Sequence, residues 1–485
     1  MTFTQIPDVL LVPGQYQEID NSLAGASSEV KRALIIATMK ASGTAQALVP
    51  VQIRSAAKAK LQFGNGSPAA IMTEKFLAKN TIEELTVLPV AEPSAGTKWS
   101  KVFTVSALNN KAGTIGFDIC GQTGESGAAE SEAPAAIAAG IVAGINSIDN
   151  CPVDAEIDGE DPTKFKVISG IKGITENDIS VIITSNASGV TITPSAAVAA
   201  TGTVDLTSAI AAMGETKFQY IMSEFSDADN IALLSAELTS RYSATRQIDG
   251  RCFIALTGEV GDASTEGTML KKAQDANSPH IILVPRGIST QLPCVWAAVW
   301  CAMLCRRLAD DPAANTSDIE LAGLTGVELP FDDRQALLQA GVCTYRLDST
   351  GTVLVERVPT SYTLNSDGER DTSYLDIQVV ETVSAVRSYI NSAARKRFKT
   401  WKLASTNENF GPGAKVMTAS IWKSFLAELY LGTFIKEKQW CQDFDSYKAS
   451  LIVSIKAGSK TRLEYQHQPV LIGQFYIGAG LNQFK

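Results

Sequence analysis

The sequence predicts a multidomain protein of the α/β and α+β classes. We expect a helix-covered mixed sheet domain with an inserted α+β module, a C-terminal α+β domain and extended terminal β arms. First, the chain has 485 residues, 45% hydrophobic and 19% charged, which suffices for several cores. Second, residues 217–357 alternate short apolar runs with helical patterns, as in a partly parallel sheet covered by helices. Third, both ends carry short apolar runs next to turn or linker residues.

Residues 1–28 are predicted to form an N-terminal arm and linker. The apolar and aromatic side chains of this arm are Val9, Leu11, Tyr16 and Ile19, and residues 21–28 (NSLAGASS) have the composition of a flexible linker. A strand on a flexible tether is suited to β-augmentation, in which it extends the sheet of another subunit. Packing of the arm on its own domain is an equally good interpretation of the residues alone.

The α/β domain is expected in residues 29–95 and 216–362. Asp227 is a candidate N-cap, because its side chain precedes a helical pattern. The expected strands are 30–37, 83–90, 218–222, 252–256 and 280–284, the expected helices are 55–63, 69–79, 227–242, 265–275 and 293–308, and a hairpin is expected in 340–357.

The inserted α+β domain is expected in residues 96–215, where the composition changes after a Pro-Ser-Ala-Gly stretch. Its expected elements are strands in 103–108, 114–119, 164–169, 179–184 and 189–193 and an Ala-rich helix in 131–146.

Residues 363–448 are expected to form a C-terminal helical domain with long helices in 371–402 and 417–437. Residues 449–485 then form a C-terminal hairpin and arm, because two runs of period two flank a Gly-Ser turn. The apolar and aromatic arm residues here are Leu463, Tyr465, Leu471, Phe475 and Phe484. An apolar strand at a chain end needs a partner, in its own fold or in a neighbouring molecule.

Composition argues against several function classes. The net charge of −9 argues against a nucleic-acid binder, which needs a basic surplus to neutralise phosphates. The first residues lack the pattern of a signal peptide, and the apolar stretch 293–305 is too short to span a bilayer. We therefore expect a soluble chain that is made in a cytoplasm and does not insert into a membrane.

The sequence predicts no catalytic, cofactor or metal site. It contains no phosphate-binding loop, no hydrolase nucleophile motif and no zinc-protease motif, and only two histidines, His280 and His467. Gly64, Gly66 and Ala69 match G-x-G-x-x-A, but a helix precedes them and Pro68 removes an N–H where phosphate would bind, so a structural turn between helices is favoured. The eight cysteines lack framework spacing, which indicates buried free thiols.

Several motifs together resemble those of tail sheath proteins of contractile-tailed bacteriophages, in particular the Mu-like group. They occur in the order of that family along nearly the whole chain. They are Ile6-Pro7, Val12-Pro13-Gly14 leading to Tyr16, Phe63-Gly64-Asn65-Gly66-Ser67, Ala112-Gly113-Thr114, Asp118-Ile119, Thr372-Ser373-Tyr374-Leu375, Lys402-Leu403-Ala404, Phe410-Gly411-Pro412-Gly413, Met417-Thr418, Phe444-Asp445, Leu451-Ile452-Val453 and Gln474-Phe475. The Ala-rich part of residues 96–215 departs from the family pattern.

The resemblance implies a structural subunit, not an enzyme, that polymerises helically around a tail tube and contracts. It implies terminal arms exchanged between subunits, and as partners the chain itself, the tail tube protein, and baseplate and tail terminator proteins. It implies a place in the virion after assembly in the host cytoplasm. It also places the tube-facing surface on the C-terminal domain, where the candidates are Arg395, Lys396, Arg397, Lys423, Lys436 and Lys438. The alternatives are a tube or capsid protein, or an α/β enzyme with an unrecognised site.

Overall fold

A computed structural model describes residues 31–484 except 407, 409, 411 and 412. The described chain forms two compact units, residues 31–384 with 471–484, and residues 385–470. The predicted arm residues Val9, Leu11, Tyr16 and Ile19 lie outside the described residues. Within the described ranges, no helix has the length and apolar character needed to cross a membrane.

The larger unit contains a six-stranded mixed sheet, as the alternating pattern predicts. Its strand order is β13-β12-β11-β1-β3-β2, and every pair is parallel except β2 with β3. The central strand β1 is buried on both faces, which explains its continuous apolar run. The strands are β1 (Arg32–Met39), β2 (Val51–Ile53), β3 (Glu84–Ala91), β11 (Tyr220–Ser223), β12 (Arg251–Leu256) and β13 (Ile281–Pro285).

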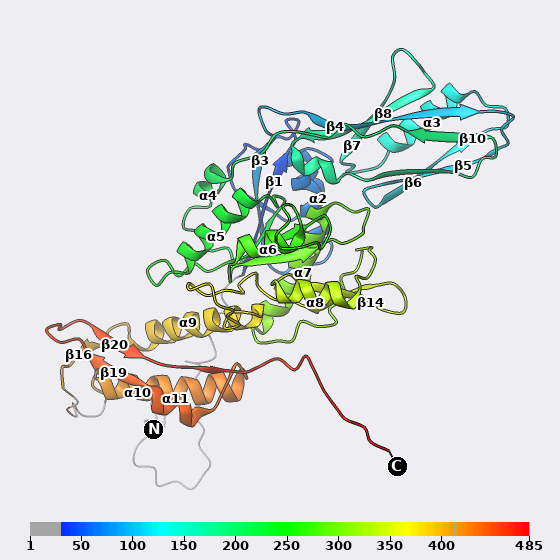
Figure 1. Ribbon diagram of the computed structural model, residues 1–485. Coiled ribbons are helices and arrows are strands. Elements are labelled where there is room, and N and C mark those ends of the chain that lie inside the picture. Colours follow the sequence, from blue (N-terminus) through cyan, green and yellow to red (C-terminus); the bar gives the residue numbers. More distant parts are fainter. Residues whose placement is uncertain (1–30, 407, 409, 411–412, 485) are drawn as a thin grey trace, which may run out of the picture. The chain divides into compact units, whose positions relative to one another are not determined.

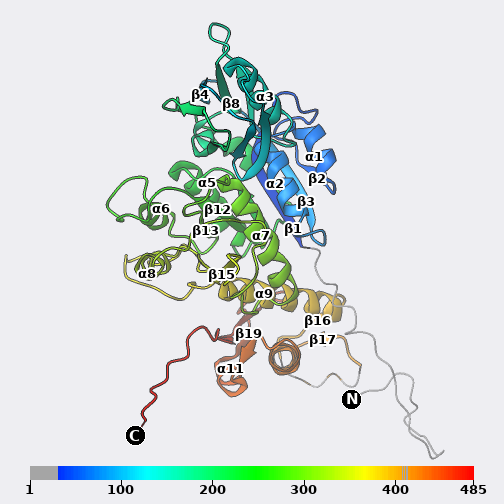
Figure 2. The ribbon, with the colours of Figure 1, turned by 90° about the vertical axis from the view of Figure 1, so that its right-hand side faces the viewer.

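Helices cover both faces of this sheet (Figure 2). Ile35 belongs to the core under α1 (Ala56–Phe63), α2 (Pro68–Leu77) and α7 (Pro293–Asp310). Ile36, the next residue of β1, belongs to the opposite core. The helices of that core are α4 (Thr207–Ala212), α5 (Ala228–Tyr242), α6 (Met269–Ala276) and α8 (Phe331–Gln339). Asp227 caps α5 as predicted, since its side chain accepts from the Asn230 N–H.

Residues 98–194 add two antiparallel sheets and a helix, seen together in Figure 1. One sheet has the order β10-β4-β8-β7 and the other β6-β5-β9. Phe103 stacks on Phe165 with ring centroids 5.2 Å apart. The elements are β4 (Lys98–Ala107), β5 (Gly113–Ile119), β6 (Gln122–Ala128), α3 (Pro134–Asn146), β7 (Val153–Ile157), β8 (Lys164–Lys172), the 3₁₀ helix η1 (Ile174–Asp178), β9 (Val181–Ser185) and β10 (Val190–Pro194).

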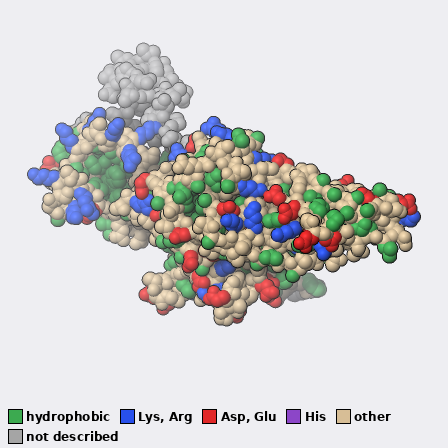
Figure 3. All heavy atoms as spheres, turned by 90° about the horizontal axis from the view of Figure 1, so that it is seen from above, with side chains coloured by type: hydrophobic (Ala, Val, Ile, Leu, Met, Phe, Trp, Pro, Cys, Tyr) green, Lys and Arg blue, Asp and Glu red, His purple; other side chains and the backbone are tan. Residues whose placement is uncertain are grey.

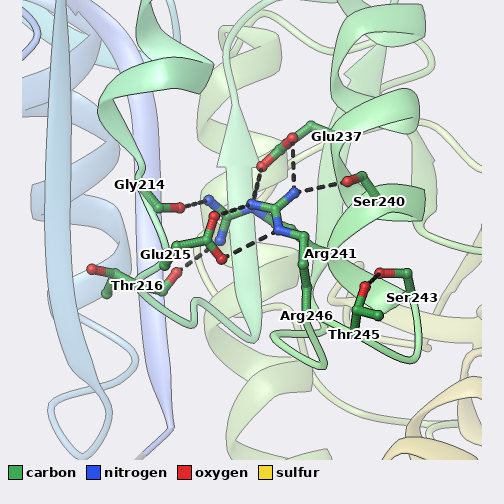
Figure 4. A network of polar contacts seen from close by, with 9 residues as sticks. All are labelled: Gly214, Glu215, Thr216, Glu237, Ser240, Arg241, Ser243, Thr245 and Arg246. Atoms are coloured by element: carbon green, nitrogen blue, oxygen red, sulfur yellow. Dashed lines mark hydrogen bonds and ion pairs between the residues drawn. The ribbon is translucent and has the colours of Figure 1, made fainter.

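Two arginines, one in α5 and one in the loop after it, bind residues 214–216, which connect the inserted module to β11 (Figure 4). Arg241 is almost fully buried and donates to the carbonyls of Gly214 and Thr216. Arg246 forms ion pairs with Glu215 at 2.9 Å and with Glu237 at 3.0 Å. These contacts fix residues 214–216 against α5 before β11 begins.

The smaller unit is built on helices with short strands, and its core is aromatic. Tyr430 stacks on Tyr447 with ring centroids 3.6 Å apart and near-parallel planes. Its elements are the end of α9 (Ile377–Phe398), β16 (Lys402–Leu403), β17 (Val416–Met417), α10 (Ala419–Glu428), the π-helix η2 (Leu429–Glu437), β18 (Cys441–Gln442), α11 (Phe444–Ser450), β19 (Ile452–Ile455) and β20 (Leu463–Gln466), with β21 (Val470–Leu471) at its end.

Three expected helices differ most from the observed ones. The helix expected in 371–402 is only α9, because Asp371 accepts from the Ser373 N–H and the Tyr362 hydroxyl and so holds a turn. The helix expected in 417–437 changes from α-helix to π-helix at Leu429. The helix expected in 265–275 begins at Met269, after the Thr268 cap. The hairpin expected in 340–357 is confirmed as β14 (Thr344–Leu347) with β15 (Val353–Arg357).

Candidate assembly surfaces

The predicted C-terminal hairpin is confirmed. β19 pairs antiparallel with β20, with Val453 opposite Tyr465, and Gly458 has a positive φ of 77° in the connection. The period-two pattern predicted one buried face, but Leu463 is half-buried and Tyr465 is 39% exposed. The hairpin therefore leaves apolar surface open within a single chain.

His467 is packed at the end of this hairpin, as its pattern predicts. Its Nδ1 lies 3.3 Å from the Tyr447 hydroxyl, and its ring contacts the rings of Tyr447 and Tyr465. Burial lowers the pKa of His467, which favours the neutral ring. This histidine is a structural residue of the smaller unit.

Tyr430 holds Val470, where the C-terminal segment of the chain begins. Its hydroxyl donates to the Gln442 carbonyl at 2.7 Å and accepts from the Val470 N–H at 3.0 Å. The next residue, Leu471, is half-buried in β21. The described residues after Leu471 form no further strand.

Tyr476 packs on the larger unit, and the sequence did not single it out. Its hydroxyl accepts from Gln378 Nε2 at 3.0 Å, and its ring lies 4.8 Å from the Arg357 guanidinium. Burial raises the pKa of Tyr476 to about 12, so the phenol is neutral. Two residues earlier, Gln474 Nε2 donates to the Ala313 carbonyl at 2.8 Å. These polar contacts hold one side of the tail on its own subunit.

The predicted arm residues Phe475 and Phe484 have exposed side chains in the C-terminal segment after β21. Phe475 is 84% exposed and Phe484 is 99% exposed. Figure 1 shows this end of the chain, in red, as an extended segment that leaves the body. Large exposed apolar side chains on a soluble chain mark an interaction surface.

All six predicted tube-facing residues are exposed, on three different elements and just beyond one of them. Arg395, Lys396 and Arg397 lie in the last turn of α9. Lys423 lies on α10, Lys436 lies in the last turn of η2, and Lys438 follows η2. An ion pair joins α9 to α10, because Arg397 Nη1 of α9 lies 2.9 Å from Glu428 Oε2 of α10.

An aromatic groove lies beside this ion pair. We call it the α9–α10 groove, and its lining includes Arg397, Phe398, Trp401, Phe425 and Glu428. The Phe398 ring contacts the Trp401 and Phe425 rings with centroids 4.9 Å apart in each case. Such a mixture of aromatic and charged side chains suits a protein partner.

The smaller unit is basic in an acidic chain. Residues 385–470 contain 14 Lys and Arg and six Asp and Glu, which gives +8, whereas the whole chain carries −9. The remaining residues therefore carry −17. On the face seen in Figure 3, Lys and Arg are interspersed with Asp and Glu, without the continuous basic track of a nucleic-acid groove.

The residues that could suggest a metal or cofactor site have structural roles in this fold. The described residues contain no group of three or more His, Cys, Asp and Glu that could hold a metal ion. All eight cysteines are buried free thiols, as predicted. Gly64 and Gly66 form the turn between α1 and α2, where the Gly66 N–H donates to Asn150 Oδ1 at 2.8 Å. The G-x-G-x-x-A match is therefore a structural turn, as predicted.

Two buried carboxyls, Glu176 and Glu224, lie close together, and the sequence did not indicate them. Burial raises the pKa of Glu176 well above its usual range, and the nearby Glu224 raises it further. Glu224 accepts from the Thr38 N–H at 2.6 Å and from the Thr38 and Thr175 hydroxyls at 3.0 Å. Burial raises the pKa of Glu224 as well, and the hydrogen bonds from Thr38 and Thr175 counteract part of that shift. Glu176 has the more strongly raised pKa, which favours its neutral form.

Comparison with known proteins agrees with an assembly protein. Residues 199–361 match the phage tail sheath protein central domain family. The chain is 28% identical, over 100% of its own length and 99% of the relative's, to the Mu-like prophage FluMu tail sheath protein of Haemophilus influenzae. Among solved structures, it is similar to a sheath tail protein from Listeria innocua (14% identity, 93% of this chain and 98% of that chain, TM-score 0.47).

A second solved structure is the contracted helical sheath of the anti-feeding prophage (12% identity, 98% of this chain and 99% of that chain, TM-score 0.46). The family and the relative are tail sheath proteins by name.

Proposed function

We propose that this chain, which carries a phage tail sheath protein central domain in residues 199–361, is the structural subunit of a contractile phage tail sheath. The observation that carries the proposal is the similarity to a Mu-like prophage tail sheath protein along the full length of both chains. The subunit polymerises helically around the tail tube, and its contraction drives the tube through the host envelope. Its further partners are baseplate and tail terminator proteins, and it is assembled in the host cytoplasm into the virion.

Neighbouring subunits exchange their arms by β-augmentation. The N-terminal arm contributes Val9, Leu11, Tyr16 and Ile19, and the C-terminal arm contributes the half-buried Leu463 and Leu471 and the exposed Tyr465, Phe475 and Phe484. An added strand gains several main-chain hydrogen bonds of roughly 0.5–1.5 kcal/mol each. Each newly buried large apolar side chain adds roughly 1.5–3 kcal/mol. Such joints keep subunits connected while they rotate during contraction.

The basic unit of residues 385–470 faces the tube. Its charge of +8 favours an acidic partner surface, and its exposed Arg395, Lys396, Arg397, Lys423, Lys436 and Lys438 supply the contacts. No nucleotide is required, because the metastable extended assembly stores the free energy of contraction.

Electron microscopy of the purified chain tests this function against its two alternatives. Long, wide hollow sheaths are the expected result. Narrow tubes or closed shells would instead identify a tube or capsid subunit, and discrete particles with measurable turnover would identify an enzyme.

A truncation tests the exchange of arms separately. Removal of residues 1–20 is expected to leave a folded, soluble protein that no longer polymerises, because it leaves every described helix and strand of residues 31–484 in place. Circular dichroism checks the fold, and microscopy checks polymerisation. Sheaths of normal length from the truncated chain would contradict the exchange of N-terminal arms while leaving the sheath function intact.

A further inference from the structure

Three large apolar side chains are exposed beside the carboxyl end of β13, an edge strand of the six-stranded sheet. Ile288 is 70% exposed, Val327 is 52% exposed and Phe331 is 70% exposed. Ile288 and Val327 are neighbours, because the Val327 N–H donates to the Ile288 carbonyl at 3.1 Å, and Phe331 follows at the start of α8. We call these three residues the α8 surface. Single exposed apolar residues are ordinary, but a group of large ones marks an interaction surface.

The backbone under the α8 surface is held by polar contacts within the larger unit. The Val327 carbonyl accepts from the Tyr345 hydroxyl at 2.7 Å. The next residue, Glu328, accepts from the Leu347 N–H at 2.7 Å and forms an ion pair with Arg334. A surface on a fixed support loses little conformational entropy when a partner covers it. The α8 surface is therefore preformed for binding.

A second group of exposed apolar side chains lies at the other edge of the same sheet, beside β2. Leu48 is 38% exposed, Val49 is 43% exposed, and Leu61 of α1 is 66% exposed. The loop that carries Leu48 and Val49 is bonded to the end of α1, because the Ala45 N–H donates to the Gln62 carbonyl at 2.8 Å. We call Leu48, Val49 and Leu61 the α1 surface. Figure 2 shows α1 with β2 on one side of the larger unit and α8 on the opposite side.

Leu48 is held in a backbone conformation that leucine seldom adopts. Its φ is +64°, in the left-handed region, where a bulky side chain is unfavourable. The Leu48 N–H donates to the Pro89 carbonyl near the carboxyl end of β3 at 2.8 Å, which keeps the residue in place. Strained residues that a fold retains are concentrated at binding and switch regions. The strain at Leu48 therefore supports a binding role for the α1 surface.

The two surfaces are flanked by opposite charges. Asp332 and Asp333 lie in the first turn of α8, whereas Lys58 lies on α1 and Arg54 lies just before it. Among the described residues, none of these four charged side chains has an ion-pair partner. An acidic apolar surface and a basic apolar surface are complementary. One chain therefore carries both halves of a possible contact, on opposite edges of one sheet.

We propose that the α8 surface of one copy of this chain docks on the α1 surface of a second copy, through the bodies of the subunits and without their arms. The contact is heterologous, because two different surfaces meet. Repetition of a heterologous contact that does not close into a ring gives a helical array. This inference rests on the proposed function, which supplies the second copy, and it assigns the body surfaces that meet.

Paired charge reversals test this docking. One variant carries Asp332→Lys and Asp333→Lys, and the other carries Arg54→Glu and Lys58→Glu. Each variant alone places like charges across every contact, so a loss of roughly tenfold or more in sedimentable polymer is expected. Both variants keep their arms intact. An equimolar mixture restores opposite charges between unlike copies, and it is expected to form polymers that contain the two variants in equal amounts.

A variant with two reversed charges outside both surfaces is the matched control. Glu125→Lys and Glu160→Lys change two exposed carboxylates of the inserted module, and this variant is expected to polymerise like the wild type. Melting temperatures check that every variant is folded. A mixture that polymerises no better than either variant alone, or variants that polymerise like the wild type, would overturn the docking. A wild-type chain that forms no polymer under these conditions would instead contradict the proposed function.

Disulfide crosslinking gives an independent measurement of which surfaces meet. All eight native cysteines are buried, so new surface thiols react selectively. A chain with Leu61→Cys and Phe331→Cys is expected to give ladders on non-reducing gels after oxidation of polymers, and no ladders from dilute unpolymerised protein. Each single cysteine variant is the control and is expected to give no dimers, because the two surfaces differ. Dimers from Phe331→Cys alone, or no ladder from the double variant in intact polymers, would contradict the heterologous contact.

Discussion

Arg251 Nε lies 3.3 Å from Glu381 Oε1, and both side chains are buried, at 1% and 9% exposure. The Nε atom makes no well-aligned hydrogen bond, so this contact is an ion pair at close range. Its Nη2 donates to the Val380 carbonyl at 3.1 Å and to the Ser384 hydroxyl at 2.9 Å, and its Nη1 donates to the Gly250 carbonyl at 2.7 Å. Arg251 at the start of β12 therefore fixes the first two turns of α9 in the larger unit.

Removal of this arginine is expected to destabilise the subunit strongly. Arg251→Met leaves the Glu381 carboxylate buried without its cation, at a cost of about 3–5 kcal/mol in the free energy of unfolding. Urea unfolding of unpolymerised protein measures the change. Arg346→Met is the matched control, because its ion pair with Asp318 is 42% and 64% exposed and is worth roughly 0–1 kcal/mol.

The double variant Arg251→Met/Glu381→Leu is expected to be more stable than Arg251→Met alone. It removes the uncompensated charge and replaces it with an apolar side chain. A double variant as unstable as the sum of the two single variants would show that the two residues act independently.

Gly66 is expected to be intolerant of any side chain. A Cβ at this position would lie 1.8 Å from the Cys151 carbonyl oxygen, and its φ is +75°. Gly351 has a similar φ of +83° but open space around it. Gly351→Ala is therefore expected to cost about 1–2 kcal/mol for the left-handed backbone alone, and Gly66→Ala at least 1–3 kcal/mol more. Equal changes in the free energy of unfolding would contradict the steric explanation.

The elements that were predicted correctly are those whose hydrophobic pattern, cap or turn is visible within a short stretch of the sequence. The buried run of β1, the Asp227 cap of α5 and the hairpin of β19 and β20 are recognisable within a few residues of chain. Several strands that lack a clear pattern of their own were missed, among them β6 and β7. β6 reads QTGESGA, which has no apolar alternation, and β7 is only five residues long.

Interactions between distant parts of the chain could not be predicted in this way. Tyr476 meets Gln378 98 residues away, and Arg251 meets Glu381 through the fold alone. The shorter α9 and the change to a π-helix at Leu429 are also set by tertiary contacts and turn chemistry. The candidate basic residues were found because charge is visible in sequence, and their division between the helices expected in 371–402 and 417–437 was predicted, but the split of the second helix into α10 and η2 was not.

The buried Glu176 predicts an unusual dependence of stability on pH. Its pKa in the folded protein is raised above the ordinary value of 4.5, chiefly by burial and then by Glu224. Above pH 4.5 the unfolded chain loses this proton while the folded chain keeps it, so the stability that Glu176 contributes falls until the pH reaches the folded pKa. Glu176→Gln is therefore expected to raise the melting temperature at pH 7–8 relative to wild type and to leave it nearly unchanged at pH 4.

Asp205 is a control for Glu176, because its pKa is shifted in the opposite direction and its contribution to stability has the opposite dependence on pH. Its pKa is lowered by hydrogen bonds from Thr207, so its contribution is present at neutral pH and is lost as the pH falls through the folded pKa. Asp205→Ala is expected to be less stable than wild type at pH 7, by an amount that shrinks toward pH 3. A Glu176→Gln effect that is the same at every pH would contradict the assignment of a neutral carboxyl.

Two sets of charge neutralisations test which basic positions face the tube. One set changes Arg395, Lys396 and Arg397 to Gln, and the other changes Lys423, Lys436 and Lys438 to Gln. Each removes three exposed charges from the same unit, so each is the control for the other. The tube-facing set is expected to lose roughly 1–3 kcal/mol of binding, about 5- to 100-fold in affinity for tail tubes isolated from the same particle. Co-sedimentation at several salt concentrations measures this loss, which shrinks as salt screens the wild-type contacts. Polymerisation without tubes should stay normal, and unchanged tube binding by both sets would contradict a tube-facing role for these residues.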